Sequence, residues 1–296
     1  MKLLVAAFAM AASLFAADVV APTGKPSEAA PPGVTLREDL VYAAYGSREL
    51  RLDLFTPNRQ GPRPGVVVVH GGGWRNGDKL KFRAFCADLA GRGYAAACIE
   101  YRLSGEARFP AALYDAKAAV RWMRAVGPQY GVDPERIAAI GGSAGGHLVG
   151  LLATSARIER LEGLGGNAGA SSAIQAAVIL GGAVDLVSQH KADNGPTPPN
   201  ALAFFGSSYA DDPAIYAEAS AVTHLDRDDP PTLFLDCGLD SPGERYIGMR
   251  RRLNELGIPN EFDVLPGGKH GCWNSQPWFD PMMDRIDGFF QRRLEP

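Results

Sequence analysis

The stretch Gly141-Gly142-Ser143-Ala144-Gly145 decides how the rest of this sequence is interpreted. It fits the pattern Gly-x-Ser-x-Gly. Residues 137–140 before it are typical of a short buried strand, and residues 146–154 after it of a helix with one apolar face. A serine on a sharp strand-to-helix turn projects its hydroxyl above the sheet, and glycines leave room for that turn. The helix N-terminus next to it suits an oxyanion. This context predicts that Ser143 is a nucleophile.

A serine hydroxyl needs a general base, and the base needs an orienting carboxylate. The chain has five histidines, and only His270 lies in a glycine-rich loop (residues 266–271) after a late predicted strand. Such a loop can carry an imidazole across the top of the sheet. The expected chain order of serine, acid and then histidine also favours His270 as the base.

The acid is expected at the end of the preceding strand, where residues 233–240 offer two aspartates. Asp240 lies in the loop beyond the strand and can reach a histidine in the next loop, so it is favoured. Asp236 is nearer the strand end, where it could instead fix the local backbone. Glu244 is a more distant third candidate.

The segment His70-Gly71-Gly72-Gly73-Trp74 follows a continuous apolar strand of four valines. Consecutive glycines let backbone N–H groups approach a developing negative charge. Gly72 and Gly73 are therefore predicted to form an oxyanion hole together with Ala144, which follows the nucleophile. His70 precedes the serine, which is the wrong order for a base, so it is expected to fix this loop by hydrogen bonding.

Two tryptophans and one more histidine flank these motifs. Trp74 is predicted to line the acyl pocket, with capping of the core as the alternative. Trp273, three residues after His270, is predicted to form a wall near the ester, with loop packing as the alternative. His147, one turn into the helix after the serine, is expected to be structural. No His-Glu-x-x-His or paired Cys-x-x-Cys motif and no phosphate-binding glycine fingerprint occurs, so neither a metal nor another cofactor is expected.

The 296 residues are 46% hydrophobic and 21% charged, which is ordinary globular composition. A formal net charge of −3 gives no electrostatic reason to expect nucleic acid or an anionic membrane as partner. Residues 1–17, a lysine followed by an apolar run and small residues, are interpreted as a signal peptide, and an uncleaved anchor is the alternative. Residues 18–34 form a Pro/Ala-rich linker before a catalytic domain of residues 35–296. The mature chain is thus expected to be secreted or periplasmic, without a membrane span.

Four cysteines are few for a secreted disulfide scaffold, so the core must provide most of the stability. Cys86 and Cys98 are interpreted as buried thiols. Cys237 and Cys272 each stand within three residues of a predicted catalytic residue. If those assignments hold, their loops meet and a disulfide is feasible, although the sequence leaves free thiols equally open.

Predicted strands and helices alternate along most of the chain, which indicates a mostly parallel sheet with helices on both faces. Ligands of such sheets bind beyond the carboxyl ends of the strands. Residues 185–229 interrupt the alternation and are interpreted as a lid or pocket insertion, with a surface excursion as the alternative.

The motifs together resemble the α/β-hydrolase esterases, near the hormone-sensitive-lipase-like carboxylesterases and closest to the bifunctional feruloyl/acetylxylan esterase-like branch. The resemblance implies an α/β-hydrolase fold with a lid-like insertion, a triad of Ser143, Asp240 and His270, and ester hydrolysis through an acyl-enzyme without a cofactor. It also implies a structural pair of Arg102 and Asp115. The segments that carry it are His70-Gly71-Gly72-Gly73-Trp74, Glu100-Tyr101-Arg102-Leu103-Ser104-Gly105, Phe109-Pro110-Ala111-Ala112 with Asp115, and Gly142-Ser143-Ala144-Gly145-Gly146-His147.

The family often has His-Gly where this chain has Asp236-Cys237, which leaves the choice of aspartate open. The implied substrates are acetyl or feruloyl esters of plant polysaccharide, or short-chain esters. An arylformamidase-like enzyme or a small-molecule carboxylesterase is an alternative, and a non-catalytic hydrolase-fold binding protein is another. The sequence gives no indication of the oligomeric state.

Overall fold

The computed structural model describes residues 23–294. The predicted signal peptide (residues 1–17) and the first part of the predicted linker (residues 18–22) lie outside the described residues. The described part of the linker, residues 23–33, has no regular helix or strand and follows the surface of the domain. Its Gly24 carbonyl accepts a hydrogen bond from the Gln276 N–H at 2.9 Å, and its Gly33 carbonyl accepts one from Asn58.

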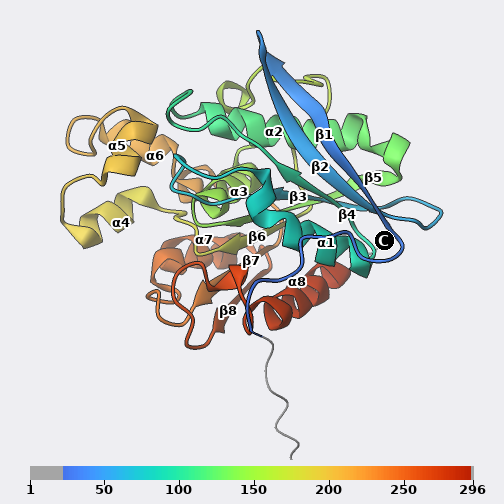
Figure 1. The fold of residues 1–296 in the computed structure, drawn as a ribbon. Coiled ribbons are helices and arrows are strands. Elements are labelled where there is room, and N and C mark those ends of the chain that lie inside the picture. Colours follow the sequence, from blue (N-terminus) through green and yellow to red (C-terminus); the bar gives the residue numbers. More distant parts are fainter. Residues whose placement is uncertain (1–22, 295–296) are drawn as a thin grey trace, which may run out of the picture.

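One eight-stranded sheet occupies the centre of the molecule, with the strand order β1-β2-β4-β3-β5-β6-β7-β8 (Figure 1). β1 and β2 form an antiparallel hairpin, β2 pairs antiparallel with β4, and all later pairs are parallel. The strands are β1 (Val34–Tyr45), β2 (Arg48–Pro57), β3 (Arg63–Val69), β4 (Ala95–Ile99), β5 (Val132–Gly142), β6 (Ala176–Leu180), β7 (Thr232–Cys237) and β8 (Asn260–Leu265).

Helices cover both faces of this sheet, as the alternation in the sequence predicts. The helices are α1 (Arg83–Arg92), α2 (Ala111–Ala125), α3 (Ala144–Thr154), α4 (Leu186–Asp193), α5 (Pro199–Phe205), α6 (Pro213–Glu218), α7 (Ile247–Leu256) and α8 (Phe279–Leu294). None of the helices among residues 23–294 combines the length and the apolar composition that crossing a bilayer requires.

The sheet separates two hydrophobic cores. In β3, Val67 and Val69 pack on the side of α2, α3 and α7, whereas Val66 and Val68 pack on the side of α1 and α8. All four valines are at most 1% exposed. A strand buried on both faces has no polar face to show, which is why β3 appears in the sequence as an uninterrupted apolar run.

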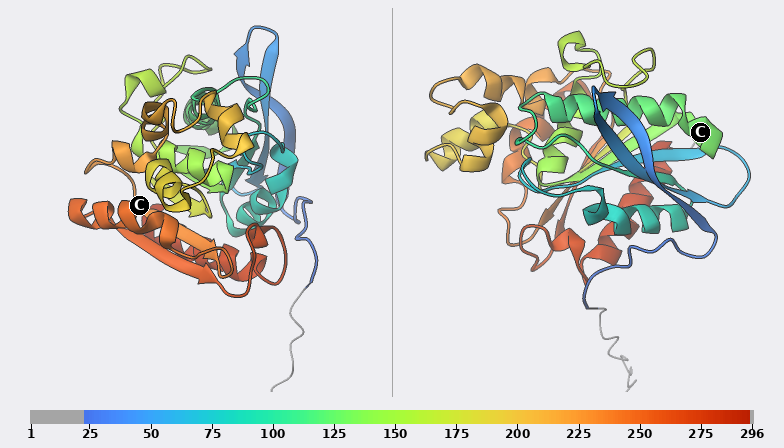
Figure 2. Two further views of the ribbon diagram at one scale, coloured as in Figure 1. Left: turned by 90° about the vertical axis from the view of Figure 1, so that its left-hand side faces the viewer. Right: turned by 45° about the horizontal axis from the view of Figure 1, so that its top comes forward.

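The insertion between β6 and β7 contains α4, α5 and α6, which project as a group from one end of the sheet (Figures 1 and 2). Pro198, Pro199 and Pro213 begin its short helices, where a proline needs no hydrogen-bond donor. The group packs onto the domain, because Phe204 of α5 is fully buried in the core that contains α2 and α3. The insertion is therefore a packed part of the domain.

Candidate active site

Ser143 occupies the turn between β5 and α3. Its backbone has φ 55° and ψ −119°, and its N–H donates to the Leu180 carbonyl at 2.7 Å. Positive φ in a non-glycine residue costs on the order of 1–3 kcal/mol, so the surroundings must hold this turn in place. Gly145 shows how closely they pack, since a Cβ there would lie 2.1 Å from the Val69 carbonyl oxygen. The turn thereby presses against β3, the strand that leads to the glycine loop.

His270 and Asp240 lie next to this serine, although they come from loops far along the chain. The Ser143 Oγ is 2.9 Å from His270 Nε2, and His270 Nδ1 is 2.6 Å from Asp240 Oδ2. The carboxylate can only accept, so Nδ1 carries the proton and Nε2 is left free to accept from the serine hydroxyl. The His270 side chain is 44% exposed. The three residues form a continuous proton-transfer chain at the surface.

Asp236 has a different environment from Asp240. It is fully buried, and its carboxylate accepts hydrogen bonds from the Gly243 N–H at 2.7 Å and the Tyr246 hydroxyl at 3.1 Å. Burial raises the pKa of Asp236. The geometry therefore connects Asp240 to the histidine, while Asp236 holds the backbone of the loop that follows β7.

Arg245 also belongs to this constellation, and sequence reasoning did not find it. Its Nη2 lies 2.9 Å from Asp240 Oδ2, the same oxygen that faces His270, and it also donates to the Asp240 carbonyl at 2.6 Å. Its Nη1 donates to the Gly181 carbonyl at 3.0 Å. Arg245 thus fixes the acid loop to the residue that follows β6. Its position in the 3-10 helix η5 (Glu244–Tyr246) carries no motif, so only the folded chain identifies it.

A disulfide joins Cys237 to Cys272 across 35 residues of sequence. Cys237 ends β7, just before the acid loop, and Cys272 lies two residues after His270. The bond therefore ties the two loops that bring Asp240 and His270 together. Cys86 and Cys98 are buried and free, as their positions in an apolar helix and strand indicate.

The loop of residues 70–74 lies on the other side of the serine. A Cβ on Gly71 would be 3.1 Å from the Ser143 Cβ, so the two backbones are in contact. Gly72 has φ 138°, and a Cβ there would lie 1.8 Å from the Asn76 carbonyl oxygen, so only glycine fits. Gly73 also has positive φ, at 60°. With Ala144 at the first position of α3, the predicted oxyanion donors flank Ser143 on two sides.

His70 is held inside this loop. Its ring stacks on Tyr101 with 4.3 Å between centroids, and its Nδ1–H donates to the Gly71 carbonyl at 2.9 Å. The Tyr101 hydroxyl donates to the His70 carbonyl at 3.0 Å. Burial lowers the pKa of His70 to about 4. The histidine is therefore neutral near pH 7 and supports the glycine loop.

The two predicted substrate-binding tryptophans are nearly completely buried. Trp74 is 7% exposed, and its indole stacks on Phe204 of α5 with 4.8 Å between centroids. Trp273 is 2% exposed, and its ring stands edge-on to His270 at 5.1 Å. Both rings mainly contact the protein itself, which is the packing alternative. Their assignment to the substrate stays a prediction that this burial does not favour.

Arg102 and Asp115 form the pair that the family resemblance implies. Asp115 is fully buried, and Arg102 Nη2 lies 2.8 Å from its Oδ1, while the Arg102 N–H donates to Oδ2 at 2.8 Å. The guanidinium also lies 3.6 Å from the centroid of the Tyr45 ring. This pair fixes the start of the segment between β4 and α2.

His147 is fully buried beneath the insertion. Its Nε2–H donates to the Ala219 carbonyl at 2.8 Å, and its Nδ1 accepts from the Trp74 indole at 3.2 Å. Burial lowers the pKa of His147 to about 4, against an ordinary value of 6.5. One ring nitrogen must stay unprotonated to accept from Trp74, so the structural role expected from the sequence has a specific geometry.

The neutrality of His147 predicts a loss of stability in mild acid. Below pH 6.5 the unfolded chain binds a proton at this position that the folded chain refuses until pH reaches about 4. The free energy of unfolding should therefore fall through this window, by up to roughly 3 kcal/mol from this group. Urea unfolding at about pH 7 and about pH 5 measures the slope. His147→Gln should show a smaller slope than the wild type, and equal slopes would contradict the assignment. The comparison removes the contributions of His70 and the carboxylates.

Among residues 23–294, no group of three or more histidines, cysteines or acidic residues is placed to hold a metal ion. The arrangement described above needs only protons, hydrogen-bond donors and a nucleophile.

The central sheet, its helices and the serine turn define an α/β-hydrolase fold. The family model BD-FAE matches residues 52–241, and the chain belongs to this family. That match spans the glycine loop, the serine turn and Asp240, whereas His270 lies beyond it.

Two curated relatives from Mycobacterium tuberculosis are similar over most of the chain. The chain is 31% identical to Esterase LipQ over 84% of its own length, and 32% identical to the Probable carboxylic ester hydrolase LipM over 78%. It spans only 64% and 55% of the lengths of these two relatives. It corresponds to a part of each.

Solved structures share the fold over nearly the whole chain. A "truncated form of carbohydrate esterase from gut microbiota" has a TM-score of 0.77 at 24% identity, covering 91% of this chain and 100% of that one. A bifunctional GH43-CE protein of Bacteroides eggerthii also has a TM-score of 0.77, at 28% identity, covering 88% of this chain and 35% of that one.

Proposed function

We propose that this protein is a serine carboxylic ester hydrolase. The carrying observation is the chain of hydrogen bonds from the Ser143 hydroxyl through His270 to Asp240, with distances of 2.9 and 2.6 Å. The esterase names of its relatives support this proposal.

The geometry supports a two-step reaction. As Ser143 Oγ bonds to the ester carbonyl carbon, its proton moves to His270 Nε2, and Asp240 stabilises the imidazolium. The tetrahedral intermediate collapses, His270 returns the proton to the leaving alcohol, and an acyl-serine remains. Water then gives one proton to His270 while its oxygen attacks the acyl carbon. The released acid takes its place in solution and Ser143 recovers its proton.

The oxyanion of each intermediate is proposed to lie among the N–H groups of Gly72, Gly73 and Ala144. These groups belong to the glycine loop and to the first turn of α3, both of which contact the serine turn. Such donors are fixed before the substrate arrives, so a single donor contributes about 3 kcal/mol to transition-state stabilisation.

As substrates we propose acetyl or feruloyl esters carried by plant polysaccharide, or short-chain esters. An exposed histidine suits an ester on a bulky carrier, and 44% of the His270 side chain is accessible. The carbohydrate-esterase titles of the structural neighbours support the same choice. We also propose export through the signal peptide of residues 1–17, because a disulfide such as Cys237–Cys272 persists in oxidising compartments.

A substrate panel tests the proposal. It compares p-nitrophenyl esters of increasing acyl length, methyl ferulate, acetylated xylan and an aryl formamide. We expect hydrolysis of p-nitrophenyl acetate and of acetylated xylan without added cofactor, with kcat/KM falling as the acyl chain lengthens. Cleavage of only the small esters would indicate a small-molecule carboxylesterase, and preference for the formamide an arylformamidase. If no member were hydrolysed, the enzymatic proposal would fail.

A further inference from the structure

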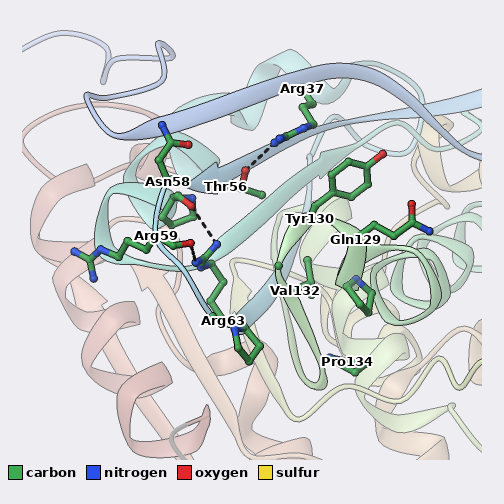
Figure 3. A pocket seen from close by; sticks show the side chains of 14 residues that line it. Arg37, Thr56, Asn58, Arg59, Arg63, Gln129, Tyr130, Val132 and Pro134 are labelled. Carbon is green, nitrogen blue, oxygen red and sulfur yellow. Dashed lines mark hydrogen bonds between the residues drawn. The ribbon is translucent and has the colours of Figure 1, made fainter.

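A second cavity lies far from Ser143, where β3 and β5 begin (Figure 3). Its volume is about 530 Å³, within the range of roughly 300–1,000 Å³ that is usual for small-molecule sites. Arg63 starts β3 and Val132 starts β5, and the other ends of these strands carry the glycine loop and the serine turn. At about 3.3 Å per residue, β3 separates the cavity from the glycine loop by roughly 20 Å. The cavity is thus distinct from the candidate active site.

The wall of this cavity carries positive charge and no carboxylate. Arg37, Arg59 and Arg63 line it, and neither aspartate nor glutamate does. Within residues 23–294, none of the three arginines forms an ion pair; the hydrogen bonds of Arg37 and Arg63 go to neutral oxygens. Asp133, which stands between two lining residues, directs its carboxylate to Arg136 at 2.8 Å. The positive charge at the cavity is therefore not neutralised by the protein.

Arg63 is the most confined of these cations, with 8% of its surface exposed. Its Nη1 donates to the Pro57 carbonyl at 3.1 Å, and its Nη2 donates to the Arg59 carbonyl. Gly131 makes room for it, since a Cβ there would lie 3.0 Å from Arg63 Nη1. Burial, with the nearby charge of Arg59, lowers the pKa of Arg63. A cation that has lost water and met only carbonyls is stabilised further by an anion.

Arg37 is held in place on the opposite side. Its Nη1 donates to the Thr56 hydroxyl at 2.9 Å, and its guanidinium lies 5.2 Å from the centroid of the Tyr130 ring. Figure 3 shows Arg37 beside Tyr130, with Arg63 across the cavity, whereas the Arg59 guanidinium is directed away from them. A planar guanidinium that is already oriented loses less entropy when it binds a two-oxygen anion.

We propose that this cavity binds an oxyanion, the carboxylate or phosphate group of a small molecule, between Arg37 and Arg63. Guanidinium groups form paired, charge-assisted hydrogen bonds with both kinds of anion. The Tyr130 ring and the proline rings of the wall offer flat surfaces to the carrier of that group, which suits an acidic sugar. The proposal concerns a separate site and does not depend on ester hydrolysis.

Isothermal titration calorimetry on the full chain tests the site, with glucuronate, inorganic phosphate and neutral glucose as probes. We expect saturable binding of glucuronate or phosphate, weakened by salt, and none of glucose. Binding of glucuronate alone identifies a carboxylate ligand, and binding of phosphate alone a phosphate ligand. Arg37→Gln should weaken binding by about tenfold or more, because a charged hydrogen bond is lost.

Arg59→Gln is the matched control, because it removes the same charge from the same cavity wall without removing a group directed into the cavity. It should change the affinity by roughly twofold or less, as for an exposed charge. Arg37→Lys retains the charge without the paired donors and should fall between Arg37→Gln and the wild type. Circular dichroism and urea unfolding establish that each variant is folded. Absence of saturable anion binding, or equal losses in Arg37→Gln and Arg59→Gln, would overturn the proposal.

Discussion

Replacing Ser143 with alanine is expected to lower kcat for p-nitrophenyl acetate by a factor on the order of 10⁴ to 10⁶. The change removes one oxygen, the atom that lies 2.9 Å from His270 Nε2. Without it no acyl-enzyme can form, and only the oxyanion donors and substrate binding remain to assist water. Initial rates measured with the wild type and the variant at matched concentrations check this result.

The fold of the variant should be unchanged. Alanine meets the same backbone demand as serine at φ 55°, and the Ser143 N–H keeps its bond to Leu180. Ser47→Ala, in the exposed turn between β1 and β2, is the matched control and should retain full activity. A fluorophosphonate probe should label the wild type at Ser143 and leave the variant unlabelled. Full hydrolysis by Ser143→Ala would show that another group is the nucleophile.

The core of the fold was accessible from the sequence because each element has a local pattern. The four valines of β3 indicate a strand buried on both faces, and the structure confirms this burial. The parallel order then follows from the alternation of strands and helices. The strands differ mainly at their ends: β5 begins at Val132, five residues before the predicted strand, because its first residues pair with Arg63 and Pro64 of β3. Pairing partners are not visible in a local pattern.

The parts of the site that were missed depend on contacts between distant segments. Arg245 acts on Asp240 and on Gly181, which lies 64 residues away in the chain, and nothing in its own sequence neighbourhood marks it. Trp74 and Trp273 stand next to motif residues, which suggested pocket walls. The structure instead places Phe204 of the insertion against Trp74, a contact that no local pattern contains. Proximity in sequence to a reactive residue therefore did not predict exposure to a ligand.

Exchanging each aspartate for asparagine is expected to separate the two candidates for the acid. Asp240→Asn should lower kcat by about 10⁴-fold with little loss of stability. The amide keeps the size of the side chain, but it cannot balance the charge of the imidazolium that His270 becomes. It can also turn its NH₂ group toward Nδ1 and favour the wrong tautomer. Arg245, 2.9 Å from the same carboxylate oxygen, would lose its ionic partner as well.

Asp236→Asn should have the opposite profile. Its carboxylate accepts from the Gly243 N–H and the Tyr246 hydroxyl inside the protein and contacts no atom of His270, so the expected cost is about 1–3 kcal/mol of stability. Its kcat should stay within about tenfold of the wild type, since Arg245 retains its contact with Asp240. Urea unfolding and steady-state rates on both variants make the comparison. A kcat loss of similar size in a stable Asp236→Asn would mean that the buried carboxylate acts on the histidine through Arg245. The reverse pattern, with Asp240→Asn active, would transfer the role of the acid to Asp236.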